Sequence, residues 1–327
     1  MIIDSTKAPM TQNHCYTQVF LGDCLIESDK IESGSVDLIL TDLPYGNMNT
    51  DGGRKMGING WDFAIEPLKI YEISNRILRK NGKMILFSQE PHSSRMITEA
   101  IPNVPFSYRA IWGKDNFANA LGTNKNMVSF YEDILIFSKN ECYEAKHPLR
   151  NVMLYYVEKY GKDFIIDLFL KEGRYTSELS ARVHASYKFG FNDGMRFDLM
   201  NEKMYLFLSD FIKFEHTYQW MKSVDFEYKT KFASTFNLWE GNKYKSNILK
   251  YKKDYNGYHP TQKPVLLLED LIKTFSNEGN LVVDLTMGSG STGVACKNTN
   301  RNFIGIEKDE GYFKIANERL NARTLFS

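Results

Sequence analysis

The chain has 327 residues, of which 43% are hydrophobic and 25% are charged, and its 41 Lys and Arg stand against 40 Asp and Glu. This length allows one large α/β domain with an insertion, or two domains. The near-zero net charge means that any surface for nucleic acid has to be local.

The cysteines are scattered, with no Cys-x-x-Cys pair and no histidine at ligand spacing. This pattern argues against structural zinc and a disulfide framework, and it favours a reducing cytoplasm. Neither a signal peptide nor a membrane-spanning segment is expected.

Residues 1–145 are predicted to form one half of an α/β domain, because strand and helix patterns alternate as a parallel sheet requires. A helix is expected over 66–80, with Pro67 in its first turn and Asn81-Gly82 as its stop. Strands are expected at 19–21, 36–41, 83–87, 106–112 and 131–137, with a loop at 116–126.

Residues 146–235 have few strand signals and are predicted to be a helical insertion, with helices at 149–160, 164–171, 177–187 and 202–214. Residues 236–327 return to the α/β pattern and complete the domain. The elements expected there are helices at 264–276, 292–298 and 310–322 and strands at 281–284 and 302–307.

The loop Asp42-Leu43-Pro44-Tyr45 follows the predicted buried strand at 36–41, and open α/β sheets place their chemistry at such strand ends. Asp42 offers carboxylate oxygens, the next two residues offer backbone carbonyls, and Tyr45 offers a flat aromatic face. Together they suit a planar ring that carries an exocyclic amine. A plain strand end followed by a turn is the alternative.

A second loop, residues 284–293, is rich in glycine and follows the predicted strand at 281–284. Gly288, Gly290 and Gly293 have the G-x-G-x-x-G spacing that lets a backbone lie against a ligand at a helix N-terminus. Glu307 ends the next strand, where a carboxylate can accept hydrogen bonds from ribose hydroxyls. A dehydrogenase uses the same geometry, but the acidic Asp284 favours the positively charged S-adenosylmethionine over a pyrophosphate.

In this order the two loops resemble the motifs of the amino-methylating DNA methyltransferases of the N6-adenine/N4-cytosine type, in the circularly permuted arrangement called the β group. Residues 42–45 match its D/N/S-P-P-Y motif, with Leu43 in place of the first proline. Residues 284–291 match D-P-F-x-G-S-G-T, with Leu285 and Thr286 in place of Pro-Phe. The resemblance covers roughly residues 17–140 and 236–320 and displaces the dehydrogenase interpretation.

Two shorter segments support the resemblance. Residues 259–264, His-Pro-Thr-Gln-Lys-Pro, resemble the segment that lines the methionine pocket of the cofactor in this group. Gly22-Asp23-Cys24 resembles the turn whose acid meets the adenine of the cofactor.

The resemblance implies a Rossmann-like S-adenosylmethionine-dependent methyltransferase sheet, with the helical insertion as the target-recognition region. It implies catalytic roles for Asp42, Leu43, Pro44 and Tyr45. The residues expected to bind S-adenosylmethionine, and its product S-adenosylhomocysteine, without a metal are Asp23, Cys24, Asp42, His259, Thr261, Lys263, Asp284, Thr286, Met287, Gly288, Ser289, Gly290, Ser291, Glu307 and Lys308.

The implied reaction is methylation of an exocyclic amine in double-stranded DNA by direct displacement, after the base is flipped out of the duplex. Adenine N6 is favoured because the N4 enzymes of the family usually carry serine where Asp42 stands. A cytosine-N4 methyltransferase, an RNA methyltransferase and a catalytically silent DNA-binding protein are the alternatives. The resemblance further implies a protein in the cytoplasm of a bacterial or phage-infected cell, and it leaves a homodimer and a separate restriction endonuclease open as partners.

Two segments are candidates for DNA contact. Lys243, Lys245, Lys250, Lys252 and Lys253 alternate with Tyr244, Tyr251, Tyr255 and Tyr258 in a tract that suits a phosphate backbone or a solvated loop. A helix with Arg182, His184 and Lys188 in the insertion suits a helix-turn-helix-like reader. Trp112 and Trp239 are expected in the core.

Overall fold

The computed structural model describes residues 15–45, 64–118, 127–140, 146–192, 196–238, 241, 243–254 and 262–321. The chain forms two compact units. The sheet unit comprises Met1–Leu78, Gly82–Asn140 and Thr235–Ser327, and the helical unit comprises Glu141–Ser234 together with Arg79–Asn81.

The sheet unit is built on one mixed sheet. Among the described residues its order is β1-β8-β7-β2-β3-β5-β4-β6. The strands are β1 (Thr17–Leu21), β2 (Val36–Thr41), β3 (Leu78–Ser88), β4 (Phe106–Ala118), β5 (Ser129–Ser138), β6 (Ile248–Lys250), β7 (Leu281–Asp284) and β8 (Asn302–Glu307). Neighbours from β1 to β3 run parallel, β5 runs antiparallel to both β3 and β4, and β6 is parallel to β4.

The sheet order brings distant parts of the chain together at one edge. Strand β2 pairs with β7, with Leu38 opposite Val282 and Ile39 opposite Val283. The carboxyl ends of these parallel strands therefore lie side by side, and the antiparallel β5 brings its amino-terminal residues to the same edge. This edge is where the predicted active-site loops begin.

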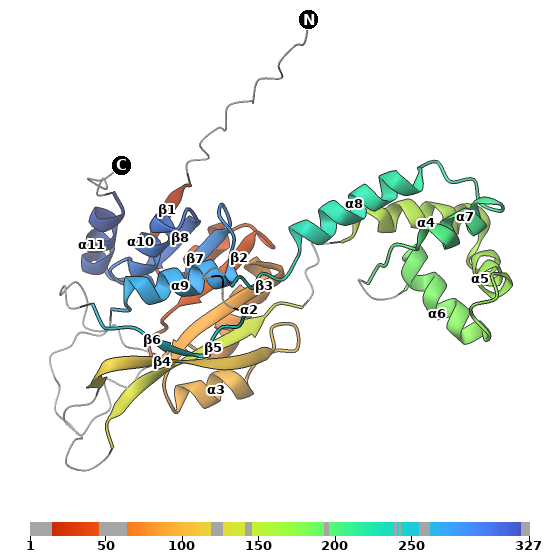
Figure 1. Cartoon of the computed structure of the whole chain (residues 1–327). Helices are drawn as coiled ribbons and strands as arrows, with labels where there is room; N and C mark the ends of the chain where they lie inside the picture. The colour runs from red at the N-terminus through yellow and green to blue at the C-terminus, as the bar shows by residue number, and fades with distance from the viewer. Residues whose placement is uncertain are drawn as a thin grey trace, which may run out of the picture. The chain divides into compact units, whose positions relative to one another are not determined.

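Helices cover both faces of the sheet. Helices α1 (Cys24–Glu27), α2 (Pro67–Ile77) and α3 (His92–Thr98) supply core side chains on one face. Helices α9 (Val265–Phe275), α10 (Ser291–Asn298) and α11 (Glu310–Asn321) supply those on the other, and Figure 1 shows them in blue beside β7 and β8. Because strand side chains alternate, Leu38 and Leu40 lie in one core and Ile39 in the other. The predicted α/β fold is confirmed.

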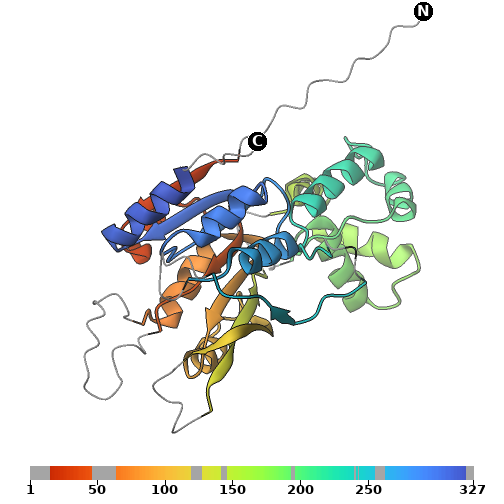
Figure 2. The same ribbon diagram turned by 60° about the vertical axis from the view of Figure 1, so that its left-hand side comes forward.

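The helical unit has a hydrophobic core of its own, and Figure 2 shows its helices in yellow-green to teal. They are α4 (Pro148–Tyr160), α5 (Lys162–Lys171), α6 (Glu178–Phe189), α7 (Glu202–Ser209) and α8 (Tyr218–Lys231). Met153, Phe169 and Phe189 are fully buried in this core. Each such side chain contributes roughly 1.5–3 kcal/mol through burial, so this segment can pack by itself.

Several predicted boundaries were wrong. The helix expected to reach residue 80 ends at Ile77, because Leu78 already pairs with Val36 in the sheet. The helix expected to reach residue 214 ends at Ser209. Residues 116–118, predicted as loop, continue β4, and the rest of that loop lies outside the described residues.

Five of the described elements were not predicted, namely α1, the 3₁₀ helix η1 (Ser28–Lys30), α3, α8 and β6. Helix α8 buries only Met221 and Asp225, so its sequence has no continuous apolar stripe. Strand β6 is three residues long, too short for a period-2 pattern. Trp112 is 2% exposed and lies in the core as predicted, whereas Trp239 is outside the described residues. None of the described helices is long and apolar enough to cross a membrane.

Candidate active site

Hydrogen bonds join the two predicted loops directly. Thr41, the last residue of β2, donates from Oγ1 to Oδ1 of Asp284 over 2.8 Å, although the two residues are 243 positions apart in the chain. Thr286 Oγ1 donates to the backbone carbonyl of Asp42 over 2.9 Å and lies 2.9 Å from Thr41 Oγ1. Thr286 stands where the motif of the resembled family has phenylalanine, a residue that cannot make this bond.

The carboxylate of Asp284 is buried and bonded on both oxygens. Besides Thr41, it accepts from the backbone N–H of Thr286 over 3.1 Å and from Thr292 Oγ1 over 2.6 Å. Burial raises the pKa of Asp284 to about 6, and the three hydrogen bonds oppose that rise. The side chain thus ties the end of β2 to the glycine loop and to α10.

The glycine loop is held close against α11 and β8. Gly290 has φ +81°, and a side chain there would bring its Cβ to 3.0 Å from Ala316 Cβ. A Cβ on Gly293 would lie 2.6 Å from Leu320 Cδ2, so the first turn of α10 needs glycine to pack. Arg319 of α11 donates to the hydroxyl of Ser289 over 3.0 Å and to its carbonyl.

The end of β8 also contacts this loop. Glu307 accepts from the backbone N–H of Gly288 on Oε2 and from that of Asp309 on Oε1, each over 2.8 Å. Burial raises the pKa of this carboxyl above its ordinary value. The backbone N–H of Gly22 donates to the Glu307 carbonyl over 2.8 Å, which fixes the turn after β1 beside the end of β8.

That turn contains Asp23 and Cys24. Asp23 accepts from the backbone N–H of Leu25 over 3.0 Å at the start of α1 and forms a 3.0 Å ion pair with Lys308. Cys24 is buried, and burial raises the pKa of its thiol to about 12. Cys24 therefore offers a ligand its backbone rather than a thiolate.

The loop after β2 places its polar groups at the sheet edge. Asp42 accepts from the Tyr45 hydroxyl on Oδ1 over 2.7 Å and from the Lys263 ammonium on Oδ2. Burial raises the pKa of Asp42, and Lys263 opposes that rise. Leu43 is only 2% exposed, so its side chain anchors the loop in the core where the family has a stiff proline. The Tyr45 ring lies 5.0 Å from the His92 ring, centroid to centroid.

Two side chains that were not predicted complete this cluster. Glu132, near the start of β5, lies 3.0 Å from Lys263 Nζ, 2.7 Å from Lys114 Nζ and 3.3 Å from the Tyr45 hydroxyl. Burial alone would raise the pKa of Glu132, but the two lysines hold it below its ordinary value. The sequence contained one signal of this site, since Glu132 and Asp133 are the only charged residues of β5.

The segment before α9 has a second buried polar group. Gln262 lies beside the glycine loop, with Oε1 3.5 Å from Ser289 Oγ, and its buried Nε2 has no hydrogen-bond partner among the described residues. Such an amide suits a ligand that accepts a hydrogen bond. His259 and Thr261 of the same segment lie outside the described residues.

The structure also describes the other predicted residues of the two loops. Met287 is buried and donates its backbone N–H to the Ile306 carbonyl over 2.9 Å, and Ser291 begins α10. Pro44 lies between Leu43 and Tyr45 and is partly buried. Asp42, Lys263 and the 284–291 loop therefore lie together at one edge, whereas Asp23 and Lys308 meet at the β1–β8 side of it.

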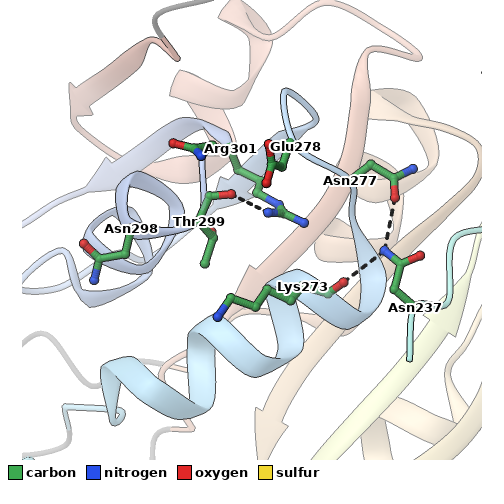
Figure 3. A pocket seen from close by; sticks show the side chains of 8 residues that line it. Asn237, Lys273, Asn277, Glu278, Asn298, Thr299 and Arg301 are labelled. Carbon is green, nitrogen blue, oxygen red and sulfur yellow. Dashed lines mark hydrogen bonds between the residues drawn. The ribbon is translucent and has the colours of Figure 1, made fainter. Parts of the chain in front are cut away.

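A pocket lies at the opposite edge of the sheet, where β7 and β8 begin (Figure 3). It is lined by Asn237, Lys273, Asn277, Glu278, Asn298, Thr299, Asn300 and Arg301. The guanidinium of Arg301 donates to the carbonyls of Thr299 and Ser276, and Asn237 donates to the carbonyl of Lys273 over 3.0 Å. These polar groups hold neighbouring loops, and none of the predicted site residues lines this pocket.

Several of the candidate DNA-contact residues have partners within their own units. Lys245 lies 2.6 Å from Asp270 Oδ1, and the Tyr251 hydroxyl donates to Asp270 Oδ2 over 2.8 Å. In α6, Arg182 forms a 3.1 Å ion pair with Glu178. Lys188 donates to a backbone carbonyl in the helical unit. Lys243, Lys250 and Lys252 are exposed, and Tyr255 and Tyr258 lie outside the described residues.

Comparison with known proteins agrees with this geometry. The model of the N6/N4 DNA methylase family matches residues 36–318. The chain is 25% identical over 310 residues to the DNA adenine methyltransferase YhdJ of Escherichia coli K12, covering 94% of this chain and 83% of YhdJ. It is 42% identical over 86 residues to the type II methyltransferase M2.DpnII of Streptococcus pneumoniae, a match to 26% of this chain that spans only 30% of the relative. The solved structure of the cytosine-N4-specific PvuII DNA methyltransferase has the same fold, with a TM-score of 0.51 at 13% identity, covering 95% of this chain and 88% of that one.

Proposed function

Because the chain belongs to the N6/N4 DNA methylase family, we propose that it transfers a methyl group from S-adenosylmethionine to the exocyclic N6 of adenine in double-stranded DNA. One observation carries the proposal. The loop that offers Asp42 and Tyr45 and the glycine loop meet at one sheet edge and are joined by the hydrogen bonds of Thr41 and Thr286. A methyl acceptor and a methyl donor bound to these loops would be neighbours.

The residues beside the glycine loop fit S-adenosylmethionine. When bound, this cofactor supplies a methyl group on a positively charged sulfonium. The buried amide of Gln262 can donate to its carboxylate, and the carboxylate of Glu307 can accept from ribose hydroxyls. Asp284, bonded to protein donors on both oxygens, would act on the sulfonium through its charge.

Asp42 and Leu43 would prepare the amine. The lone pair of an adenine amine is delocalised into the ring, which makes the amine a poor nucleophile. Hydrogen bonds from the amine to the Asp42 carboxylate and the Leu43 carbonyl favour a tetrahedral nitrogen, whose lone pair is available for direct displacement. Tyr45 would stack on the base after it leaves the duplex.

Adenine is proposed over cytosine because Asp42, rather than serine, opens the catalytic motif. Cytosine N4 is the alternative, and the family contains both kinds of enzyme: YhdJ is named an adenine methyltransferase and the PvuII enzyme a cytosine-N4-specific one. Nucleoside analysis of methylated DNA separates the two, since N6-methyladenine and N4-methylcytosine are different products.

We also propose that the helical unit is the target-recognition region. It lies in the chain between the two halves that carry the motifs, and its own core lets it vary without disturbing the sheet. A cytoplasmic location, a homodimer and a separate restriction endonuclease are further proposals that follow from the resemblance.

The function is tested by transfer of labelled methyl groups from S-adenosylmethionine to duplex DNA. Asp42→Ala should abolish transfer while cofactor binding, measured by calorimetry, persists. Asp29→Ala, a change at an exposed carboxylate, is the matched control and should keep full activity. Label found only on RNA or on protein, or full activity of Asp42→Ala, would overturn the proposal.

A further inference from the structure

Glu132 is a buried carboxylate that none of the motifs contains. It is only 5% exposed and reaches the active-site edge because β5 runs antiparallel to β3, so that residues near the start of β5 lie where β3 ends. Burying an ionised carboxylate costs several kcal/mol unless partners compensate it. Two lysines and one tyrosine do so, which makes Glu132 part of the cluster around Asp42 rather than an isolated charge.

Glu132 and Asp42 share the same donors. The ammonium of Lys263 contacts both carboxylates, and so does the hydroxyl of Tyr45, which is 2.7 Å from Asp42 and 3.3 Å from Glu132. A carboxylate has about four acceptor sites in total. Tyr45 bonds one oxygen of Asp42 and Lys263 bonds the other, so about two acceptor sites of this carboxylate are left for an incoming amine, while Glu132 holds the same two donors in place.

Lys114 balances the charge of the cluster. It lies 2.7 Å from Glu132 and does not pair with Asp42 in the structure. With Asp42, Glu132, Lys114 and Lys263 all ionised, two negative charges meet two positive ones. Among the described residues, Asp284 at the end of β7 and Lys253 also act on this cluster, Asp115 accepts from the backbone N–H of Lys253, and the His92 ring lies beside Tyr45.

We propose that Glu132 is a positioning residue for methyl transfer: it shares Lys263 and Tyr45 with Asp42, and Lys114 holds it in place, so that Asp42 keeps an acceptor site for the target amine. This inference rests on the function proposed above. It assigns Lys263 to the two carboxylates, a partner set that the sequence alone did not indicate. Glu132 itself does not touch the reacting atoms.

Two variants that change the charge beside Asp42 in opposite directions test the inference. Activity requires ionised Asp42, so it is present above the pKa of Asp42 and lost below it. Glu132→Gln removes a negative charge and leaves Lys263 on Asp42, so the acid limb of kcat/KM should move down by about one pH unit, and kcat should fall about tenfold. Lys114→Met removes a positive charge, so the acid limb should move up by a similar amount.

The matched control is Glu72→Gln, which removes an exposed glutamate paired with a lysine and should leave the limb unchanged. Circular dichroism establishes that each variant is folded, and the Asp42 carboxyl can be titrated by carbon NMR in the same proteins without measuring activity. The inference is overturned if the acid limb of kcat/KM and the NMR titration of Asp42 stay at the wild-type pH. It is also overturned if they move in the same direction in both variants. A wild-type protein without transfer, or an active Asp42→Ala, instead refutes the proposed function, and the NMR titrations then still report whether Glu132 and Lys114 act on the Asp42 carboxyl in opposite directions.

Discussion

The two edges of the sheet use buried cations in different ways. At the carboxyl edge, Lys263 lies between the carboxylates of Asp42 and Glu132. At the amino edge, Arg301 donates to the carbonyls of Ser276 and Thr299 and to a hydroxyl, so its hydrogen-bond partners are neutral. Both cations are more than nine-tenths buried.

The nature of these partners distinguishes a cation with a structural role from one that can take part in a functional site. The hydrogen-bond partners of Arg301 are carbonyls and a hydroxyl that do not titrate, so these bonds fasten the loops before β7 and β8. The partners of Lys263 titrate and have acceptor sites that a ligand can compete for. Burial of a charge therefore says little about function until the nature of its partners is known.

The largest effect is expected for Lys263→Met. The variant leaves Asp42 and Glu132 as neighbouring buried carboxylates without their shared ammonium, which should lower the free energy of unfolding at pH 7.5 by about 3–5 kcal/mol. The loss should shrink at pH 5.5, because the pKa of both carboxyls rises without the cation and protonation then relieves their repulsion. Urea unfolding at the two pH values measures this, and Lys273→Met, 4.0 Å from Glu269 at the other edge, should cost less than about 1 kcal/mol. An equal loss at both pH values would contradict the assignment.

Arg301→Met should also destabilise the protein, by about 3 kcal/mol, because it leaves buried carbonyls without donors. This loss should be nearly the same at pH 5.5 and 7.5, since the carbonyls do not titrate. Methyl transfer per folded molecule should not change. A strong pH dependence, or a loss of kcat in the folded variant, would remove the distinction between the two edges.

Sequence patterns could locate the loops that contain Asp42 and Asp284, but not the charged cluster around Asp42. Asp42 and Asp284 were predicted because each lies at the carboxyl end of a buried apolar strand, and parallel strands bring such ends together. The contact of Glu132 with Lys263 spans 131 positions and depends on β5 lying antiparallel beside β3, an order that no local pattern encodes. The end of α2 was missed because pairing of Leu78 in the sheet overrides its helix propensity.

Asp284→Asn tests a carboxylate that resembles both edges. Like the partners of Arg301 it is hydrogen-bonded within the protein, and like the partners of Lys263 it titrates. Its pKa, raised from 3.8 to about 6 by burial, means that the folded protein holds this proton more tightly than the unfolded chain. Ionised Asp284 therefore lowers stability as the pH rises from about 4 through 6, by up to about 3 kcal/mol. Asparagine keeps an acceptor without the charge, so the stability of the variant relative to wild type should rise between pH 4 and 7.5. A difference that is constant with pH, in parallel urea titrations, would show that the charge of Asp284 is already compensated.

The smallest effect is expected for Thr286→Val, which removes one hydroxyl and keeps the shape of the side chain. Its hydrogen bond to the Asp42 carbonyl is worth about 1 kcal/mol, so kcat should fall roughly five- to tenfold if this bond positions the catalytic loop. Thr274→Val is the matched control, because the buried Thr274 hydroxyl donates to the Asp270 carbonyl in α9, away from the site. Both variants should lose similar stability, and only Thr286→Val should lose activity. If both keep wild-type kcat, Thr286 merely fastens the loop, as Arg301 does at the other edge, and the active-site edge needs only its charged cluster to act.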